Sequence, residues 1–409
     1  MTLIAFVGGA CSRIFGGTDV GGILPYRLDL EVYRLGAMVW RDGHPLYTDG
    51  ALPTTRLGLP LPFTYPPASA IAFVPFTWMP LEVAGLLMSL LSICLLMLVV
   101  RIALRSSGLV DVISRRYHIG IWWQIAAVTA LALWLDPVWA TFNFGQINII
   151  LMSMVMVDLM LLTSPRWRGA LTGAAGAFKL TPMAFLLQLV VARQWRATAA
   201  VCGAFVAVGA IGFVCAPSDS RKYWTNTVFH TDRIGNLAGR NNQNINGFWR
   251  RLLADESLAK ALWALTAIAA TVLAIVAIRR CLAARQHLMA LSATAVWGLL
   301  VSPTTWGHHW VWVIPAMVGL IGVAAETASA RIRNTYIGLT VAGLIIFGSS
   351  PYKHMADPAT RVHWNLLQTI VGNSYAAWGL ALLVLLAVTI RPASAAAHPG
   401  LHHHPAERN

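Results

Sequence analysis

Asp29 and Glu31 form a pair of carboxylates in the charged segment Tyr26-Arg27-Leu28-Asp29-Leu30-Glu31-Val32-Tyr33, directly after the first apolar stretch of the chain. Near a membrane surface, a carboxylate can act as a general base and take the proton of a hydroxyl group whose oxygen attacks an activated substrate. Asp29 is the first candidate because it comes first after the apolar stretch. Glu31 is the second, and it would share the face of Asp29 in an extended segment. The alternative is that both carboxylates lie at the interface and pair with Arg27 or Arg34.

Lys179 is a single lysine in the middle of an apolar stretch, in the sequence Ala177-Phe178-Lys179-Leu180-Thr181-Pro182. A charge at membrane depth is costly, so such a residue is a functional candidate, and an anionic phosphate is its natural partner. The alternative is that the side chain extends to the membrane surface. Arg240 and Arg250, at the two ends of an amide-rich segment, are further candidates for phosphate binding.

His308 and His309 lie beside tryptophans in Ser302-Pro303-Thr304-Thr305-Trp306-Gly307-His308-His309-Trp310. Paired histidines in this context could bind phosphate oxygens or, together with Trp306, stack on a sugar ring. A structural aromatic belt at the membrane surface is the alternative. Metal ligation is not expected, because adjacent histidines point in different directions and a third ligand would have to come from elsewhere.

Amide side chains gather in two segments, and Tyr65 lies in a third. The first contains Asn143, Gln146 and Asn148, and the second contains Asn242, Gln243 and Asn246. Amides suit the recognition of a polyol, so these residues are candidates for sugar or acceptor binding. Helix capping at the first segment and a flexible polar loop at the second are the alternatives.

Tyr65 belongs to Pro62-Phe63-Thr64-Tyr65-Pro66-Pro67, where the proline pair prevents a regular helix. We expect a rigid corner that leads into an interfacial helix. Tyr65 is a candidate for stacking on a sugar or a lipid.

The composition indicates that lipid is the main solvent of these segments. Of the 409 residues, 57% are hydrophobic and 11% are charged, whereas soluble proteins carry about 25% charged residues. We predict an all-α polytopic membrane protein with about eleven transmembrane helices, from apolar runs near the length that a membrane crossing needs. The ranges assigned to spans are 2–18, 82–101, 119–136, 146–163, 197–216, 259–279, 287–303, 308–325, 335–350 and 374–390.

The segment 169–191 is apolar but is interrupted by Lys179 and Pro182. It is bounded by arginines on both sides, so we predict two half-helices that form a re-entrant hairpin. A broken helix at membrane depth is tolerated only against protein or a wet cavity. The hairpin therefore marks a site.

The net charge of +14 follows from topology, because arginines such as Arg101, Arg105, Arg115 and Arg116 cluster between spans. By the positive-inside rule these segments are cytoplasmic. No nucleic-acid-binding motif is present, and no nucleic-acid partner is expected. Both termini are predicted to be cytoplasmic. The segments predicted to lie outside, and to form the active-site face, are 19–80, 217–258 and 351–373.

We predict one membrane domain, residues 1–392, and a disordered cytoplasmic tail, 393–409, that contains three consecutive histidines. The five cysteines show no CxxC or metal spacing, so neither a disulfide framework nor a zinc site is expected. No cofactor is expected either, and a role for a divalent ion stays open.

Six segments occur in the order found in one family. They are Asp29-Leu-Glu-Val-Tyr, Phe63-Thr-Tyr-Pro-Pro, Gly145-Gln-Ile-Asn, Lys179-Leu-Thr-Pro, Asn242-Gln-Asn-Ile-Asn-Gly and Ser302-Pro-Thr-Thr-Trp-Gly-His-His. Over roughly residues 20 to 320, the chain resembles actinobacterial polyprenol-phosphate-mannose-dependent alpha-(1→2)-mannosyltransferases, which belong to the GT-C superfamily of membrane glycosyltransferases. Each motif is weak alone, and the ordered set is specific. Asn244 departs from the pattern, which has a small hydroxyl residue there.

The resemblance implies a GT-C-type fold and an inverting reaction on the outer face of a bacterial cytoplasmic membrane. Mannose would pass from polyprenyl-phosphate mannose to a mannosylated glycolipid acceptor, such as a phosphatidylinositol mannoside, lipomannan or lipoarabinomannan. Asp29 matches the catalytic aspartate of the family, and the histidine pair matches a motif near its active site. The implied partners are the two lipid substrates and membrane lipids.

A phosphate is already a competent leaving group, so one base and several positive donors suffice for such a reaction. Lys179, Arg240 and His308 or His309 are the candidates that stabilise the charge on the departing phosphate. The sequence has no Gly-rich nucleotide loop, so a nucleotide is not an expected partner.

Other functions stay open. An arabinofuranosyltransferase that uses a polyprenyl-phosphate arabinose donor would have the same scaffold, and nothing in the loops identifies the sugar. A transporter or flippase for a lipid-linked sugar would also need many spans and a polar cavity. Transporters commonly have paired inverted repeats with two matching broken helices, whereas this sequence has one break, at residues 179–182. A purely structural membrane subunit would not require the amide-rich and histidine-rich segments.

Overall fold

The computed structural model describes residues 8, 26–48, 50, 52–357 and 364–391. Every regular element in these ranges is a helix, and their β pairing is limited to an isolated antiparallel bridge between Asn242 and Trp306. The all-α prediction is therefore confirmed. The predicted first span, 2–18, lies outside the described residues apart from Gly8, and so does the predicted tail, 393–409. The assignment of 1–392 to one domain stays a prediction.

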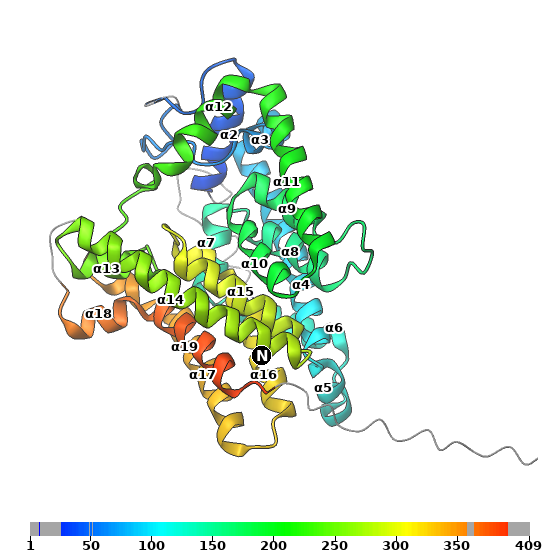
Figure 1. The fold of residues 1–409 in the computed structure, drawn as a ribbon. Helices are drawn as coiled ribbons and strands as arrows, with labels where there is room; N and C mark the ends of the chain where they lie inside the picture. Colours follow the sequence, from blue (N-terminus) through cyan, green and yellow to red (C-terminus); the bar gives the residue numbers. More distant parts are fainter. Residues whose placement is uncertain (1–7, 9–25, 49, 51, 358–363, 392–409) are drawn as a thin grey trace, which may run out of the picture.

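The α-helices run through the chain with few long interruptions (Figure 1). They are α2 (Leu28–Arg41), α3 (Pro67–Ala72), α4 (Leu81–Ser106), α5 (Leu109–Tyr117), α6 (Ile121–Ala132), α7 (Asp136–Phe144), α8 (Asn148–Met160), α9 (Ala170–Phe178), α10 (Leu186–Val191), α11 (Trp195–Cys215), α12 (Pro217–Thr225), α13 (Ile245–Leu252), α14 (Glu256–Ala283), α15 (His287–Val301), α16 (Val313–Glu326), α17 (Ala330–Ser349), α18 (Leu366–Gly372) and α19 (Ser374–Thr389). Short 3-10 helices are η1 (Val74–Trp78), η2 (Thr181–Phe185), η3 (Thr227–Phe229), η4 (Thr231–Ile234), η5 (Gly307–Trp312) and η6 (Pro351–His354).

Five helical stretches in the described part of the chain are long and apolar enough to cross a membrane, and the number rises to 7 if each of two bent pairs counts as one span. Other predicted spans are shorter helices: α8 has 13 residues and α15 has 15. At 1.5 Å per residue such helices measure roughly 20 Å, less than the roughly 30 Å of hydrocarbon. The multi-span prediction is confirmed, and the count of about eleven stays a prediction.

Burial separates central helices from peripheral ones. The stretch Gly307–Glu326, which comprises η5 and α16, is 78% buried, whereas α11 and α14 are 11% and 22% buried. The low values leave most of the apolar surface of α11 and α14 for lipid. The stretch that begins with η5 is therefore surrounded mainly by protein.

The predicted span 119–136 is wrong as a single helix. The chain forms α6 and α7, which meet at an angle of 78°. The second helix begins at Asp136-Pro137, because proline has no N–H to continue the preceding helix and its ring disfavours the helical conformation of the residue before it. The bend places the end of α7 beside η5.

The predicted break at Lys179 and Pro182 is confirmed. Helix α9 ends at Phe178, Lys179 has extended backbone angles (φ −153°, ψ 125°), and η2 and α10 follow. The predicted helix after the proline corner is confirmed as α3, which begins at Pro67. In Figure 1, α2, α3 and α12 lie together at one end of the molecule, and α5 lies at the opposite end.

The expectation of an extended segment around Asp29 and Glu31 is wrong. These residues belong to α2, whose Leu30, Tyr33 and Ala37 are fully buried at helical spacing. Two positions along a helix are roughly 200° apart around its axis. The two carboxylates therefore point in different directions, and they cannot share one site.

Asp158 ties the start of α9 to α8. The side chain is fully buried and accepts hydrogen bonds from the backbone N–H groups of Gly169 and Thr172 and from the hydroxyl of Thr172, each at 2.7 Å. We expect Asp158→Ala to lower the free energy of unfolding by about 3 kcal/mol or more, because it leaves three buried donors without an acceptor. The melting temperature in detergent, compared with that of the exposed control Asp111→Ala, measures the effect. Equal melting temperatures for the two variants would contradict it.

Candidate active site

A cavity of about 480 Å³ opens between α2, the end of α9, α15 and η5. This size lies within the usual range of ligand sites, roughly 300 to 1,000 Å³. One part of its lining is polar, with Asp29, Gln146, Asn148, Lys179, His308 and His309. Another part is apolar, with Leu151, Met152, Phe185, Trp297 and Trp312. The cavity therefore suits a molecule with a polar head and an apolar tail.

Asp29 stands in the first turn of α2 and lines the cavity. A carboxylate in the first turn is favoured by the positive end of the helix dipole. Its Oδ2 accepts a hydrogen bond of 2.6 Å from Gln146 Nε2, and Oδ1 has no hydrogen-bond partner in the described part of the chain. Burial raises the pKa of Asp29 to about 6, against the hydrogen bond from Gln146 and the charge of Lys179, which lower it. A carboxyl group with this pKa is poised to exchange a proton near neutral pH.

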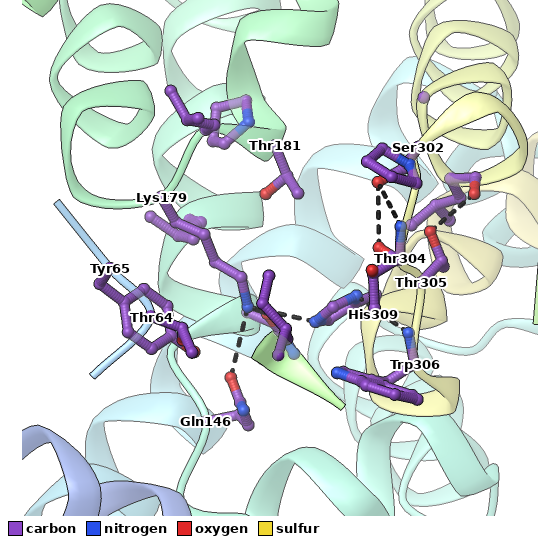
Figure 2. Close-up of a pocket in the computed structure, with 18 of the residues that line it drawn as sticks. Thr64, Tyr65, Gln146, Lys179, Thr181, Ser302, Thr304, Thr305, Trp306 and His309 are labelled. Atoms are coloured by element: carbon purple, nitrogen blue, oxygen red, sulfur yellow. Dashed lines mark hydrogen bonds between the residues drawn. The ribbon is translucent and has the colours of Figure 1, made fainter. Parts of the chain in front are cut away.

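Lys179 lies at the carboxyl end of α9, where the helix dipole favours a cation. Its ammonium donates to Asn148 Oδ1 at 2.9 Å and to Gln146 Oε1 at 3.4 Å, as Figure 2 shows for Gln146. Its Nζ also lies 5.4 Å from the ring centroid of Tyr65. The structure thus brings together four of the residues singled out in the sequence.

His309 lies next to Lys179 in the cavity (Figure 2), and the distance between His309 Nε2 and Lys179 Nζ is 3.3 Å. The backbone N–H of Trp306 donates to His309 Nδ1 at 3.2 Å. A neutral His309 therefore carries its proton on Nε2, and two donor groups point at each other. An anionic oxygen placed beside both would accept from each of them, so this pair of donors suits a phosphate.

His308 is buried, and its backbone carbonyl accepts hydrogen bonds from Asn148 Nδ2 at 3.0 Å and Thr141 Oγ1 at 3.2 Å. These bonds fix η5 against α7 and α8. The His308 ring lies edge-on to the ring of His309, with 4.6 Å between centroids. Both histidines and Trp306 line the cavity, as the sequence motif suggested.

Tyr65 lines the cavity with its ring, while its hydroxyl is engaged elsewhere. The Tyr65 hydroxyl lies 2.9 Å from the Tyr33 hydroxyl. The Tyr33 hydroxyl donates a hydrogen bond of 2.8 Å to Gln146 Oε1. The carbonyl of Tyr65 accepts a hydrogen bond of 2.6 Å from Tyr47. The proline corner therefore holds the Tyr65 ring beneath the Lys179 ammonium.

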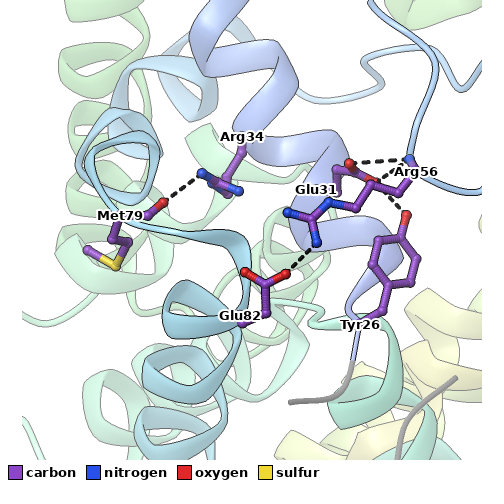
Figure 3. Close-up of polar contacts among 6 residues, drawn as sticks. All are labelled: Tyr26, Glu31, Arg34, Arg56, Met79 and Glu82. Carbon is purple, nitrogen blue, oxygen red and sulfur yellow. Dashed lines mark hydrogen bonds and ion pairs between the residues drawn. The ribbon is translucent and has the colours of Figure 1, made fainter. Parts of the chain in front are cut away.

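Glu31 lies outside the cavity lining, in the group of polar contacts that Figure 3 shows. Its carboxylate accepts hydrogen bonds from the hydroxyl of Tyr26 and from the backbone N–H of Arg56. The Arg56 side chain in turn pairs with Glu82 at the start of α4. Glu31 thus fastens the loop around Arg56 to α2, and this position argues against its role as the alternative base.

The amides of the segment 242–246 are also outside the cavity lining. Asn242, Gln243 and Asn246 are at most 1% exposed, and their side chains donate to backbone carbonyls of Leu237, Arg240, Pro303 and Gly372. Such bonds leave these amides little freedom to bind a polyol. Asn244 acts as the N-cap of α13 through the N–H of Gly247.

Arg240, Arg250 and Asn143 do not line the cavity either. Arg240 donates to the carbonyl of Met355, and Arg250 bonds with Asn246 and lies 4.0 Å from Glu256. The carbonyl of Asn143 is 3.5 Å from Arg27. Of the three cations named from the sequence as phosphate ligands, the structure brings only Lys179 to the cavity.

A model of glycosyltransferase family 87 matches residues 63–303. The chain belongs to glycosyltransferase family 87. The matched range includes Tyr65, Gln146 and Lys179. The family resemblance and the assignment as a membrane glycosyltransferase are thereby confirmed.

Relatives with assigned functions are similar to this family 87 protein over most of its length. A polyprenol-phosphate-mannose-dependent alpha-(1-2)-phosphatidylinositol mannoside mannosyltransferase of Mycobacterium tuberculosis is 37% identical over 92% of this chain and 87% of that protein. A polyprenol-phosphate-mannose-dependent alpha-(1-2)-phosphatidylinositol pentamannoside mannosyltransferase of Mycolicibacterium smegmatis is 33% identical over 78% of this chain and 75% of that one. The crystal structure of ArnT from Cupriavidus metallidurans bound to undecaprenyl phosphate aligns with 94% of this chain and 77% of that chain, at 16% identity and a TM-score of 0.37.

Arg233 is a cavity residue of this family 87 protein that sequence reasoning missed. It lines the cavity, donates to the carbonyl of Phe63 at 2.6 Å and lies over the ring of Tyr47 at 5.8 Å. The signal that could have revealed it is an arginine inside a segment predicted to lie outside, where the positive-inside rule does not call for one.

A buried polar clasp, formed by Asp136, Tyr352, Lys353 and Tyr375, was also missed. Asp136 accepts hydrogen bonds from the hydroxyls of Tyr352 and Tyr375, each at 3.1 Å, and pairs with Lys353. A side chain on Gly307 would reach within 2.1 Å of the Tyr352 hydroxyl, so only glycine permits this close approach. The clasp therefore holds η6 and α7 directly against the start of η5.

No group of three or more His, Cys, Asp or Glu residues in the described ranges is placed to hold a metal ion.

The clasp gives a stability prediction. We expect Lys353→Met to lower the free energy of unfolding by about 2 kcal/mol, because Asp136 is left as a buried charge without its cation; a fully buried pair would lose more. The double variant Asp136→Asn/Lys353→Met should recover part of that loss. Melting temperatures of the two single variants and the double variant in detergent measure the coupling. Additive losses would contradict it.

Proposed function

We propose that the chain is an inverting glycosyltransferase that transfers mannose from polyprenyl-phosphate mannose to a mannosylated glycolipid, forming an alpha-(1→2) linkage. The acceptor would be a phosphatidylinositol mannoside, lipomannan or lipoarabinomannan. The observation that carries this proposal is the meeting of Asp29 with the donors of Lys179 and His309 in one cavity. The names of the mycobacterial relatives support the choice of donor and acceptor.

Asp29 would act as the general base. The hydroxyl oxygen of the acceptor forms a bond to C1 of the mannosyl group, while the bond between C1 and the phosphate oxygen breaks. The hydroxyl proton passes to Asp29 Oδ1, and the electron pair of the broken bond leaves with the polyprenyl phosphate. Attack on the face opposite the phosphate converts a beta-linked donor into an alpha-mannoside.

Lys179 and His309 would bind the departing phosphate. Their donor groups lie 3.3 Å apart, and an anionic oxygen beside both would accept a hydrogen bond from each. Positive donors that are in place before the reaction stabilise the charge that develops on the leaving group. Asn148, which accepts from Lys179 and donates to the His308 carbonyl, keeps the ammonium and η5 together.

The apolar lining of the cavity would hold the start of the prenyl chain. Leu151, Met152 and Phe185 lie next to the polar residues, and Trp297 and Trp312 extend this surface along α15 and η5. A lipid donor bound in this way would place its phosphate at the boundary between the polar and apolar parts. That boundary is where Lys179 stands.

The cavity would open on the outer face of a bacterial cytoplasmic membrane, with both termini in the cytoplasm. Helix α4 begins at Leu81, beside the Glu31 and Arg56 cluster, and its last turns carry Arg101 and Arg105. By the positive-inside rule the arginine end is cytoplasmic, which leaves α2 and Asp29 on the outer side. The same side carries the amide-rich segment that follows α12.

The central prediction concerns Asp29. In reconstituted vesicles with synthetic polyprenyl-phosphate mannose and a phosphatidylinositol mannoside acceptor, we expect Asp29→Asn to reduce transfer of labelled mannose by at least about 100-fold, because a general base contributes roughly 100- to 10,000-fold. Asp42→Asn, which removes an exposed carboxylate just after the same helix, serves as the matched control and should keep wild-type activity.

Glu31→Gln separates the two carboxylates. We expect it to lower the melting temperature and to keep transfer per folded molecule. Wild-type levels of transfer by Asp29→Asn would refute the assignment of the base. Transfer from polyprenyl-phosphate arabinose but not from the mannose donor would refute mannose as the transferred sugar. No transfer from either donor would favour a transporter.

The pKa of Asp29 predicts the pH dependence of the reaction. The base must be ionised, so we expect kcat/KM for the donor to level off at about pH 7 and to fall about tenfold per pH unit below the pKa of about 6. An ordinary aspartate would give the same fall only near pH 4. Initial rates in vesicles buffered identically on both sides give this profile. A plateau that extends down to pH 5 would contradict a base with a raised pKa.

A further inference from the structure

Gln146 lies in a short link between α7 and α8 whose backbone is fixed. Its N–H donates to the carbonyl of Thr141 at 2.9 Å. The preceding Gly145 has φ 69°, and a side chain there would come within 2.9 Å of the Cβ atoms of Arg27 and Leu30 on α2. The link therefore lies directly against the first turn of α2, and its position relative to that turn is set.

The side chain of Gln146 is 5% exposed, and both ends of its amide are engaged. Nε2 donates to Asp29 Oδ2 at 2.6 Å, and Oε1 accepts from the Tyr33 hydroxyl at 2.8 Å and from Lys179 Nζ at 3.4 Å. The opposite orientation of the amide would place its NH2 group against the Lys179 ammonium and its oxygen against a carboxylate. The observed orientation is thus the one that all of its neighbours require.

Gln146 therefore stands between the two opposite charges of the cavity. In the described part of the chain, Asp29 and Lys179 form no direct ion pair, and each bonds to a different end of the same amide. A direct pair would consume the lone pairs that a base needs and the N–H groups that a phosphate needs. The amide bonds to Oδ2 and leaves Oδ1 of Asp29 without a hydrogen-bond partner among the described residues.

We propose that Gln146 is a positioning residue that keeps Asp29 and Lys179 apart and directs Oδ1 of Asp29 toward the acceptor hydroxyl. This role differs from the one inferred from the sequence, in which Gln146 binds the sugar. The proposal rests on the proposed function, since it assigns Asp29 the base. The proposal is tested by measuring the proton affinity of Asp29. A Gln146 that only binds the sugar would not set that affinity.

The groups that face Asp29 come from several elements. Tyr33 is on its own helix, Tyr65 is on the proline corner, and Lys179 is at the end of α9. His309 contacts Lys179. In the described ranges, the hydrogen bond that the Asp29 carboxylate accepts comes from Gln146.

The test compares Gln146→Leu and Gln146→Glu with wild type. Glutamate places a second carboxyl group beside Asp29 and should raise its proton affinity, whereas leucine lets Asp29 and Lys179 form a direct ion pair, which should lower it. We expect the acid limb of the kcat/KM profile to move by about one pH unit or more, a tenfold change in proton affinity, upward in Gln146→Glu and downward in Gln146→Leu. At the optimum pH, kcat should fall at least about 10-fold in Gln146→Leu, with KM for the acceptor changed by less than about 3-fold.

Matched substitutions at Gln286 control for the chemistry of the change itself. This residue donates to Glu326 at the turn between α14 and α15 and is outside the cavity lining. Gln286→Leu and Gln286→Glu should leave the profile in place. An unmoved acid limb in the Gln146 variants, with a raised KM for the acceptor and an unchanged kcat, would overturn the proposal and return Gln146 to sugar binding.

A second readout needs no activity. Infrared spectra recorded over a pH titration contain the carboxyl band of Asp29, which the difference between wild type and Asp29→Asn identifies. We expect the midpoint of this band to fall in Gln146→Leu, where Asp29 and Lys179 pair directly, and to stay in Gln286→Leu. If wild type transfers no sugar while the midpoint shifts, the proposed function fails and the positioning of Asp29 stands. An unshifted midpoint in a folded Gln146→Leu refutes the positioning.

Discussion

A carboxylate and an ammonium group that share a poorly hydrated cavity attract each other strongly. At 4 Å and an effective dielectric constant near 20 the attraction is about 4 kcal/mol. Left alone, Asp29 and Lys179 would collapse into an ion pair, and neither could serve a substrate. The amide of Gln146 lies between them and satisfies both. Because each charge enters the cavity on a different helix, the separation depends on how rigidly the backbones of α2, α9 and the α7–α8 link are held.

Each of these backbones is fixed by contacts, most of which lie away from the cavity. The carboxylate of Asp158 holds the start of α9, and Lys179 stands one residue beyond its end. Gly145 brings the α7–α8 link against α2. On the far side, Asn148 and the clasp around Asp136 hold η5 and its histidines. Some polar groups thus face the substrate space, whereas others, buried between helices, set the positions of the groups that face it.

Sequence patterns located much of this arrangement. Lysine and proline inside an apolar stretch identified the break at Lys179, because few explanations exist for a charge at that depth. The sequence pattern does not separate the roles of Asp29 and Glu31. In the extended segment that we expected, both would face the same way, and only a helix directs them to different sides. The amides of 242–246 were interpreted as ligands, but burial by Ser302–Thr305 and Gly372, which are distant in sequence, engages them in backbone hydrogen bonds. Arg233 and the Asp136 clasp also depend on contacts between distant segments.

The clasp also has a consequence for how the protein is made. Asp136 and Lys353 are 217 residues apart in the chain. At about 5 to 20 residues per second, a ribosome needs roughly 10 to 45 seconds to make the intervening segment. During that interval the carboxylate of Asp136 has neither its cation nor its two tyrosine hydroxyls, and an unpaired carboxylate is costly in lipid. The half-made protein must therefore keep α7 near water or within the insertion machinery, and η5 reaches its final place only when the segment with Tyr352, Lys353 and Tyr375 arrives.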